Sequence, residues 1–182
     1  MAFDLLKGPL AGLTDSKQLT ESRRLQFFDR LTCDARIEWA VAQMSAFDVD
    51  RMNILRATHA AMSHAVESLP HPPDAALIDG PHVPRMACPA RGIVSGDSLS
   101  LSIAAASVLA KVSRDRWMCE LDHVYPEYGF ARHKGYGTVE HRKALARFGP
   151  CPEHRKTFRP VALRLASGDA AGALCGRNGD GH

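Results

Sequence analysis

The amino-acid sequence predicts an α/β protein, in which helices cover the faces of a β-sheet and a basic helical segment follows. Segments with apolar residues at every third or fourth position alternate with short apolar runs bounded by turn residues, a pattern typical of helices alternating with strands. The 182 residues, 45% hydrophobic and 24% charged, are enough to bury one core and too few for two full domains. No apolar run approaches the ~20 residues that span a bilayer, and no secretory signal pattern is present, so we expect a soluble, cytoplasmic protein.

Two helices and a strand are predicted in the first 70 residues. Thr20 precedes an amphipathic run and is expected to cap a helix there. Residues 36–41 alternate polar with apolar side chains, as a half-buried strand does. Ser45 is a further helix cap, and the apolar spacing over residues 53–69 predicts a second helix that a cluster of prolines ends.

Two more strands and two more helices are predicted beyond residue 74. The apolar run 75–78 ends at Asp79 and a glycine, which indicates a buried strand finishing in a tight turn, and residues 92–94 suit another short strand. One long helix is expected from residue 96 to about 125. Thr138 can cap a final helix, and a Gly-Pro pair ends it.

Positive charge gathers in the last third of the chain. Residues 132–159 contain many Lys, Arg and His residues and only two acidic residues, Glu140 and Glu153. Such a segment can bind a polyanion. We therefore expect an α/β core (1–128), a basic helical extension (129–166) and a disordered tail of small residues (167–182).

Two aspartates are candidates for catalysis. Asp79 follows a buried strand, and Asp97 lies at the mouth of the long helix. Functional sites in open α/β sheets gather at the carboxyl ends of strands, and two carboxylates there could share Mg²⁺ or Mn²⁺, which favour oxygen ligands. An aspartate before glycine is also a common turn residue, and one at a helix start is a common cap, so both alternatives stay open.

Two further segments could contact a ligand. Ser16 and Lys17 precede the first helix, where phosphate binds readily, although an ordinary capping stretch looks similar. In the segment HKGYGT, two glycines around Tyr136 allow close approach of the backbone while the ring stacks on a sugar or base, or serves as a core aromatic. No P-loop, G-x-S-x-G or Rossmann glycine motif is present, which excludes those nucleotide-binding and hydrolase signatures.

Taken together, six segments resemble bacterial ribonuclease HII, in order and over residues 12–161. They are GLTDSKQLTESRR, NILRATHAAM, LIDG, SGDSLSLSIAAASVLAKVSRDR, YPEYGFARHKGYGTVEH and GPCPEHRKTFRPV. The resemblance implies an RNase H-like fold, with a mixed sheet flanked by helices and a C-terminal helical extension. It also implies an endonuclease, usually monomeric, that uses Mn²⁺ or Mg²⁺ to hydrolyse RNA in RNA–DNA hybrids and to incise DNA at embedded ribonucleotides.

The resemblance assigns roles to individual residues. Asp79 and Asp97 match the third and fourth carboxylates of the family's metal site. Tyr136 matches the tyrosine that senses the ribose, whose 2′-hydroxyl distinguishes RNA from DNA. Lys17 matches a position near the nucleic-acid backbone. The flanking Ser16, His133 and Lys134 complete the expected substrate-binding set.

One family feature is not in this sequence: the strand with the DEAGRG motif, which supplies two carboxylates and a backbone clamp. Either residues 8–12 follow a remnant of it, with Lys7 in the arginine's place and Asp4 at the second acid, or residues 1–10 are the end of a later strand. We favour the second alignment because it runs on without gaps. Both lack the acid pair, so we expect a first strand to be missing and a chain that is weakly active or inactive and poorly stable as a monomer. The alternatives are a non-catalytic binder of hybrid or duplex nucleic acid and an α/β domain unrelated to nucleic acid.

Overall fold

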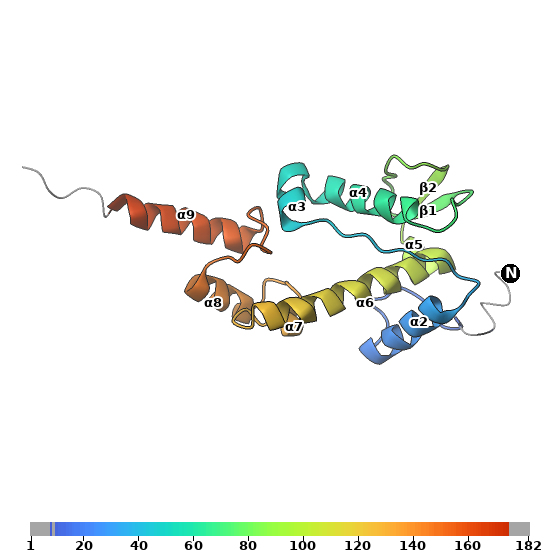
Figure 1. The fold of residues 1–182 in the computed structure, drawn as a ribbon, viewed down its shortest axis with the longest axis horizontal. Helices are drawn as coiled ribbons and strands as arrows, with labels where there is room; N and C mark the ends of the chain where they lie inside the picture. The colour runs from blue at the N-terminus through green and yellow to red at the C-terminus, as the bar shows by residue number, and fades with distance from the viewer. Residues whose placement is uncertain (1–7, 9, 175–182) are drawn as a thin grey trace, which may run out of the picture. The chain divides into compact units, whose positions relative to one another are not determined.

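The computed structural model describes residue 8 and residues 10–174, with side chains up to residue 166 (Figure 1). Its elements in order are α2 (Glu21–Cys33), α3 (Ala46–Met52), α4 (Ile54–Glu67), β1 (Ala76–Asp79), β2 (Ala90–Ile93), α5 (Gly96–Leu99), α6 (Leu101–Val124), α7 (Phe130–His133), α8 (Val139–Phe148) and α9 (Arg159–Leu174). The chain forms two compact units. Unit 1 comprises residues 1–44 and 55–116, and unit 2 comprises residues 45–54 and 117–182.

Unit 1 is built around a core between α2 and α6. The predicted cap is confirmed: the Thr20 hydroxyl accepts a hydrogen bond from the backbone N–H of Arg23 at 3.3 Å. The core cluster comprises Leu10, Phe27, Phe28, Leu31, Val108, Leu109 and Val112. Burying each large apolar side chain contributes about 1.5–3 kcal/mol, so this cluster holds α2 on the first half of α6.

The sheet of the described residues is one parallel pair. Ala76 pairs with Ala90 and Asp79 with Ile93, which confirms the two strands predicted on either side of the proline-rich loop. A Cβ on Gly92 would lie 2.6 Å from the carbonyl oxygen of Gly80, so the turn after β1 requires a glycine on β2. The mixed sheet expected from the resemblance is present in the described residues only as this parallel pair.

The strand predicted over residues 36–41 is wrong. This segment carries no strand assignment, and the burial of its side chains does not alternate. Ile37 packs against the unit 1 core, whereas Trp39 and Val41, which would share its face on a strand, are 40% and 41% exposed. A strand also needs a neighbour to hydrogen-bond its backbone, and among the described residues β1 and β2 pair only with each other. Alternation in the sequence does not provide such a partner.

The single long helix predicted from residue 96 to 125 is also wrong, because it is two helices. Ser100 is extended, with φ −125° and ψ 124°, and separates α5 from α6. Its N–H donates to the carbonyl of Gly96 at 2.7 Å, and its carbonyl accepts from Ala104 at 2.9 Å. Ser100 therefore ends one helix and begins the next.

Unit 2 comprises α3, the end of α6, and α7 to α9. The Ser45 and Thr138 caps are both confirmed, through bonds to the backbone N–H groups of Asp48 at 3.0 Å and His141 at 3.3 Å. The Asp50 carboxylate joins α3 to the start of α9, because it accepts the backbone N–H of Lys156 at 2.6 Å and both the N–H and the hydroxyl of Thr157. The core cluster comprises Met118, Leu121, Tyr128, Phe130, Leu145, Cys151 and Val161.

The expected division of the chain differs from these units. The boundary between units falls within α6, after residue 116, whereas the expected boundary at 128 lies inside unit 2. The tail expected over 167–182 begins inside α9, whose helical backbone runs to residue 174, and residues 175–182 lie outside the described part. An aspartate and two glycines in 167–174 do not exclude a helix that has already started.

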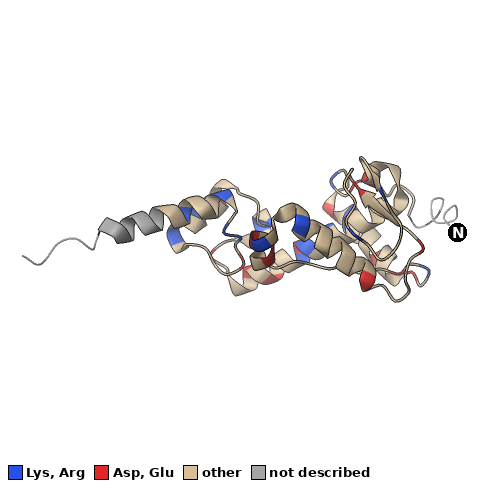
Figure 2. Cartoon of the chain, turned by 90° about the horizontal axis from the view of Figure 1, so that it is seen from above, with Lys and Arg blue, Asp and Glu red and all other residues tan. Residues whose placement is uncertain are grey.

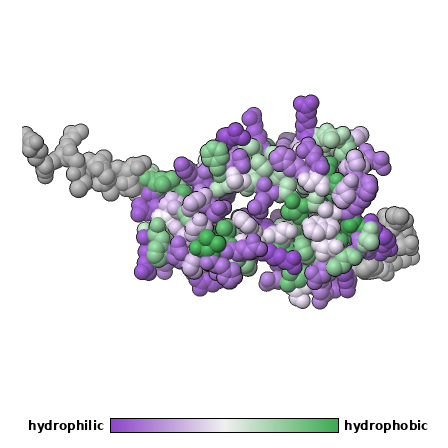
Figure 3. Space-filling view, in the orientation of Figure 1, coloured by the Kyte–Doolittle hydropathy of each residue, from purple (hydrophilic) through white to green (hydrophobic). Residues whose placement is uncertain are grey.

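The described surface carries scattered charge and apolar side chains. Up to residue 166, α9 has arginines and no acidic residue, in agreement with the basic character predicted for this segment (Figure 2). Apolar side chains reach the surface in separate places on the face shown in Figure 3. No helix within the described residues is both long and apolar enough to cross a membrane.

Candidate active site

Asp79 is the last residue of β1, and its exposed side chain turns toward α5. Its Oδ1 accepts a hydrogen bond from the backbone N–H of Gly96 at 2.9 Å. The parallel pairing with β2 explains this contact, because β2 ends level with β1 and leads within three residues into α5. The carboxyl end of the sheet therefore brings a carboxylate next to a helix start.

Asp97 directly follows the glycine that Asp79 binds. Its side chain is partly exposed, and its Oδ1 lies 3.5 Å from the hydroxyl of Ser98, a long distance for a hydrogen bond. The N-terminus of α5 has no side-chain cap at Ser95. Asp97 is thus not the N-cap of α5. The side chain of Asp79 bonds the backbone of Gly96, and Gly96 is the residue directly before Asp97.

Ser95 and Gly96 shape this corner, and the sequence analysis did not single them out. A Cβ on Gly96 would lie 2.5 Å from Ile103 Cδ1 and 3.3 Å from Ile93 Cβ, so a larger residue here requires the neighbouring side chains to move. Ser95 has φ 55°, in the left-handed region that a serine seldom adopts. The small residues around Asp97 in SGDS were the available signal for such a close approach.

The carboxylate oxygens of Asp79 and Asp97 could supply some of the ligands of a hard divalent cation. Two carboxylates and no nitrogen or sulfur donor suit Mg²⁺ or Mn²⁺, whose other ligands can be water and substrate phosphate. Within the described residues, no group of three or more His, Cys, Asp or Glu side chains could hold a metal ion. Asp79 and Asp97 therefore fit part of an ion site.

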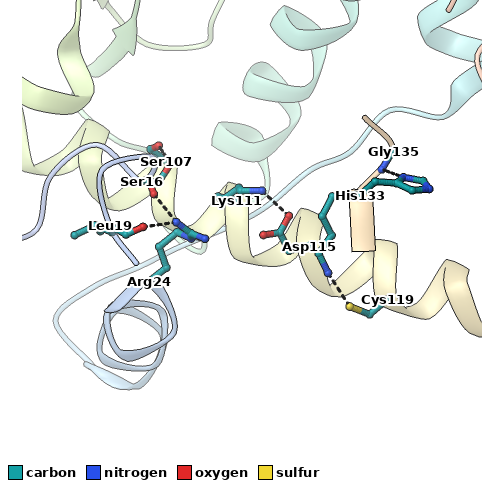
Figure 4. A network of polar contacts seen from close by, with 10 residues as sticks. Ser16, Leu19, Arg24, Ser107, Lys111, Asp115, Cys119, His133 and Gly135 are labelled. Carbon is teal, nitrogen blue, oxygen red and sulfur yellow. Dashed lines mark hydrogen bonds and ion pairs between the residues drawn. The ribbon is translucent and has the colours of Figure 1, made fainter. Parts of the chain in front are cut away.

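Ser16 and Lys17 lie in unit 1, on the turn before α2. Ser16 is 4% exposed, and its hydroxyl bonds the hydroxyl of Ser107 on α6 at 2.7 Å. Arg24 donates to the carbonyl oxygens of Ser16 and Leu19 and so ties the turn to α2 (Figure 4). The side chain of Lys17 is exposed. The turn thus offers an ammonium group, while the Ser16 hydroxyl is already engaged in the interior.

Tyr136 lies in unit 2 and is 69% exposed, which excludes the alternative of a core aromatic. His133 is 7% exposed, and its Nε2 donates to the carbonyl of Tyr128 at 2.7 Å while its Nδ1 accepts from the N–H of Gly135 at 3.2 Å. The ammonium of Lys134 lies 3.0 Å from the sulfur of Cys119. Tyr136 therefore offers its ring to solvent, on a loop that His133 holds from inside.

Behind this loop lies a histidine pair that the sequence analysis missed. His141 Nε2 and His154 Nε2 are 3.0 Å apart, and both side chains are buried. Burial, followed by the charge of neighbouring His141, lowers the pKa of His154 from 6.5 to about 4, and burial also lowers the pKa of His141. Both imidazoles are therefore neutral at pH 7. Single histidines spaced 8 and 13 residues apart give no local signal of such a cluster.

The fold has a close counterpart among solved structures. The ribonuclease H2 of Pyrococcus horikoshii OT3 superposes with a TM-score of 0.74, covering 92% of this chain and 86% of the other. At 20% sequence identity, this similarity shows the fold alone. The chain has an RNase H2-like fold, described here as mostly helical with one parallel strand pair.

Sequence comparison then gives the family. The family described as Ribonuclease HII matches residues 5–161. The ribonuclease HII of Albidiferax ferrireducens is 53% identical over 154 residues, which are 85% of this chain and 74% of that protein. That of Desulfitobacterium hafniense is 53% identical over 156 residues, 86% of this chain and 60% of that protein. The chain belongs to the ribonuclease HII family and is by family an endonuclease, a phosphodiester hydrolase.

Proposed function

We propose that this chain acts on RNA in RNA–DNA hybrids and on single ribonucleotides embedded in duplex DNA, with Asp79 and Asp97 as metal ligands. The observation that supports the proposal is the hydrogen bond from the backbone N–H of Gly96 to Asp79 Oδ1, because Gly96 directly precedes Asp97. Their oxygen donors favour Mn²⁺ or Mg²⁺.

The chemistry is phosphodiester hydrolysis beside a ribose. When bound, a divalent cation would stabilise the negative charge that develops on the phosphate and the leaving oxygen. Asp79 and Asp97 would hold that cation through their carboxylate oxygens. A water molecule attacks phosphorus in line and releases a proton to solvent as the bond from phosphorus to the 3′-oxygen breaks, and the 3′-oxygen takes up a proton from solvent.

Each unit, taken by itself, offers side chains suited to nucleic acid in this proposal. The exposed ammonium of Lys17 suits a backbone phosphate, and the exposed ring of Tyr136 suits stacking on a ribonucleotide with its hydroxyl near the 2′-oxygen. Lys134 adds positive charge. Ser16 and His133 act indirectly, because their buried side chains hold the two contact segments in place.

Both carboxylates have to be well positioned in this proposal, because a displacement of about 1 Å in a reacting group can cost ~10²-fold in rate.

The test uses the 182-residue chain and a labelled DNA duplex that contains one ribonucleotide, with Mn²⁺ and then Mg²⁺. We expect nicking beside the ribonucleotide, abolished in Asp79→Asn and retained in Asp74→Asn, a matched change at an exposed aspartate five residues earlier. Equal nicking by both variants would contradict the site. Binding that weakens steeply with salt, without any nicking, would instead favour a non-catalytic binder.

A further inference from the structure

Backbone contacts fix the base of the Tyr136 side chain. The ring is 69% exposed, so little packing holds it. The N–H of Tyr136 donates to the carbonyl of His133 at 2.8 Å, and its carbonyl accepts from the N–H of Thr138 at 2.8 Å and from His141 Nδ1 at 2.9 Å. The direction of the ring therefore depends on the backbone of Tyr136, and the side chain of His141 holds that backbone through its carbonyl oxygen.

The proton positions in the cluster follow from its acceptors. The carbonyl of Tyr136 can only accept, so His141 carries its proton on Nδ1 and its Nε2 must accept. His154 then donates from Nε2 across 3.0 Å, which leaves its Nδ1 to accept the backbone N–H of Cys151 at 3.1 Å. The sulfur of Cys151 also lies 3.0 Å from His154 Nδ1. The chain of bonds therefore runs from Cys151, in the loop between α8 and α9, through both imidazoles to Tyr136.

Packing holds this chain of bonds in one position. His141 is 1% exposed, and its ring stacks on His133 at 4.3 Å between centroids with an interplanar angle of 10°. Phe158 stacks on His141 at 6.0 Å, and a Cβ on Gly137 would lie 3.3 Å from Phe158 Cζ. The loop thus rests close to the Phe158 ring, which would have to shift slightly to admit a Cβ at residue 137.

We propose that His141, supported by His154, is a positioning residue that sets the placement of Tyr136 toward the ribose. This inference rests on the proposed role of Tyr136. It names the residue that holds Tyr136 in the position from which its side chain would distinguish a ribonucleotide from a deoxyribonucleotide. The Nδ1 bond holds the Tyr136 carbonyl, while the Nε2 bond ties His141 to the loop that leads into α9.

Two substitutions at His141 separate its two bonds. The amide nitrogen of asparagine takes the place of Nδ1, so His141→Asn keeps a donor for Tyr136 and loses the bond to His154. The amide of glutamine reaches the place of Nε2, so His141→Gln keeps the bond to His154 and loses the bond to Tyr136. Both remove the ring from the same buried site, so each is the control for the other.

The first measurement is binding, which needs no catalysis. Fluorescence anisotropy gives the ratio of Kd for an all-DNA duplex to Kd for the same duplex with one ribonucleotide. We expect His141→Gln to lower this ratio about three- to tenfold, the range for one lost hydrogen bond, and His141→Asn to keep it. In a Tyr136→Ala background, His141→Gln should have no further effect. Equal loss in the two variants, or loss in neither, would overturn the positioning role.

The second measurement needs no nucleic acid. Amide hydrogen exchange at Tyr136 and Thr138 should speed up in His141→Gln and stay near the wild-type rate in His141→Asn. If the exchange rates follow this pattern while the wild-type chain does not distinguish the two duplexes, the role proposed for Tyr136 is wrong and the loop contact stands. If exchange is equally fast in both variants, His141 does not hold the loop.

Discussion

The buried histidine pair predicts that unit 2 loses stability in mild acid. Unfolded histidine has a pKa near 6.5, whereas the pKa of folded His154 is about 4. Above pH 6.5 neither state binds the proton. Between pH 6.5 and 4 only the unfolded state binds it, so the free energy of unfolding falls as the pH falls and then levels off below pH 4.

The size of the effect follows from the shift. A difference of about 2.5 pKa units at 1.36 kcal/mol each corresponds to a loss of about 3 kcal/mol across that window. His141 adds to it in the same direction, because burial lowers its pKa too. Cys151 and Tyr128 contact His154, and burial raises the pKa of the Cys151 thiol and of the Tyr128 hydroxyl, so both are neutral in this range.

The assay is urea unfolding at pH 7, 6, 5 and 4 in a Trp39→Phe background. The remaining tryptophan, Trp117, packs against the unit 2 core and reports its unfolding. His154→Gln keeps a donor toward His141 and does not titrate. The loss of unfolding free energy between pH 7 and pH 4, about 3 kcal/mol in the wild-type chain, should therefore mostly disappear in this variant. The control is His82→Gln, at an exposed histidine of unit 1. An unchanged pH dependence in His154→Gln, or a midpoint near 6.5 in an NMR titration of His154, would refute the reasoning.

Two further predictions concern unit 1. Gly96→Ala should lower the free energy of unfolding of unit 1 by about 1–3 kcal/mol, because the new methyl group would lie 2.5 Å from Ile103 Cδ1 and 3.3 Å from Ile93 Cβ. Urea unfolding measures this change, and unchanged stability would contradict the close approach. Ser107→Ala should lower the free energy of unfolding by about 1–3 kcal/mol, because it leaves the buried Ser16 hydroxyl without its partner. Adding Ser16→Ala should restore part of this loss, and strictly additive effects in the double variant would contradict the pairing.

Local signals in the sequence were sufficient for most helices. Thr20, Ser45 and Thr138 each bond a backbone N–H three residues ahead, a contact that needs no distant residue. The two short strands beside the proline-rich loop were found for a similar reason, since an apolar run before Asp79 and a glycine leaves few other conformations. The alternating segment 36–41 misled because a strand also needs a partner, and that partner comes from elsewhere in the chain.

The candidate site divides in the same way. Motifs in the sequence pointed to Asp79, Asp97 and Tyr136, and the structure keeps all three at least partly exposed. The motifs did not reveal that the Ser16 hydroxyl and the His133 ring are engaged in the interior, because burial depends on what packs over a residue.

By itself, the sequence determined the caps, the turns, the family and the residue types available for metal and ribose. Only the tertiary structure decided that the Asp79 carboxylate accepts the backbone N–H of Gly96, 17 residues later in the chain. It also decided that His154 hydrogen-bonds His141, 13 residues earlier. Caps and turns depend on neighbours within a few residues, which the order of amino acids specifies directly. Contacts between distant residues form only when whole elements pack, and their geometry is set by the shape of the core that results.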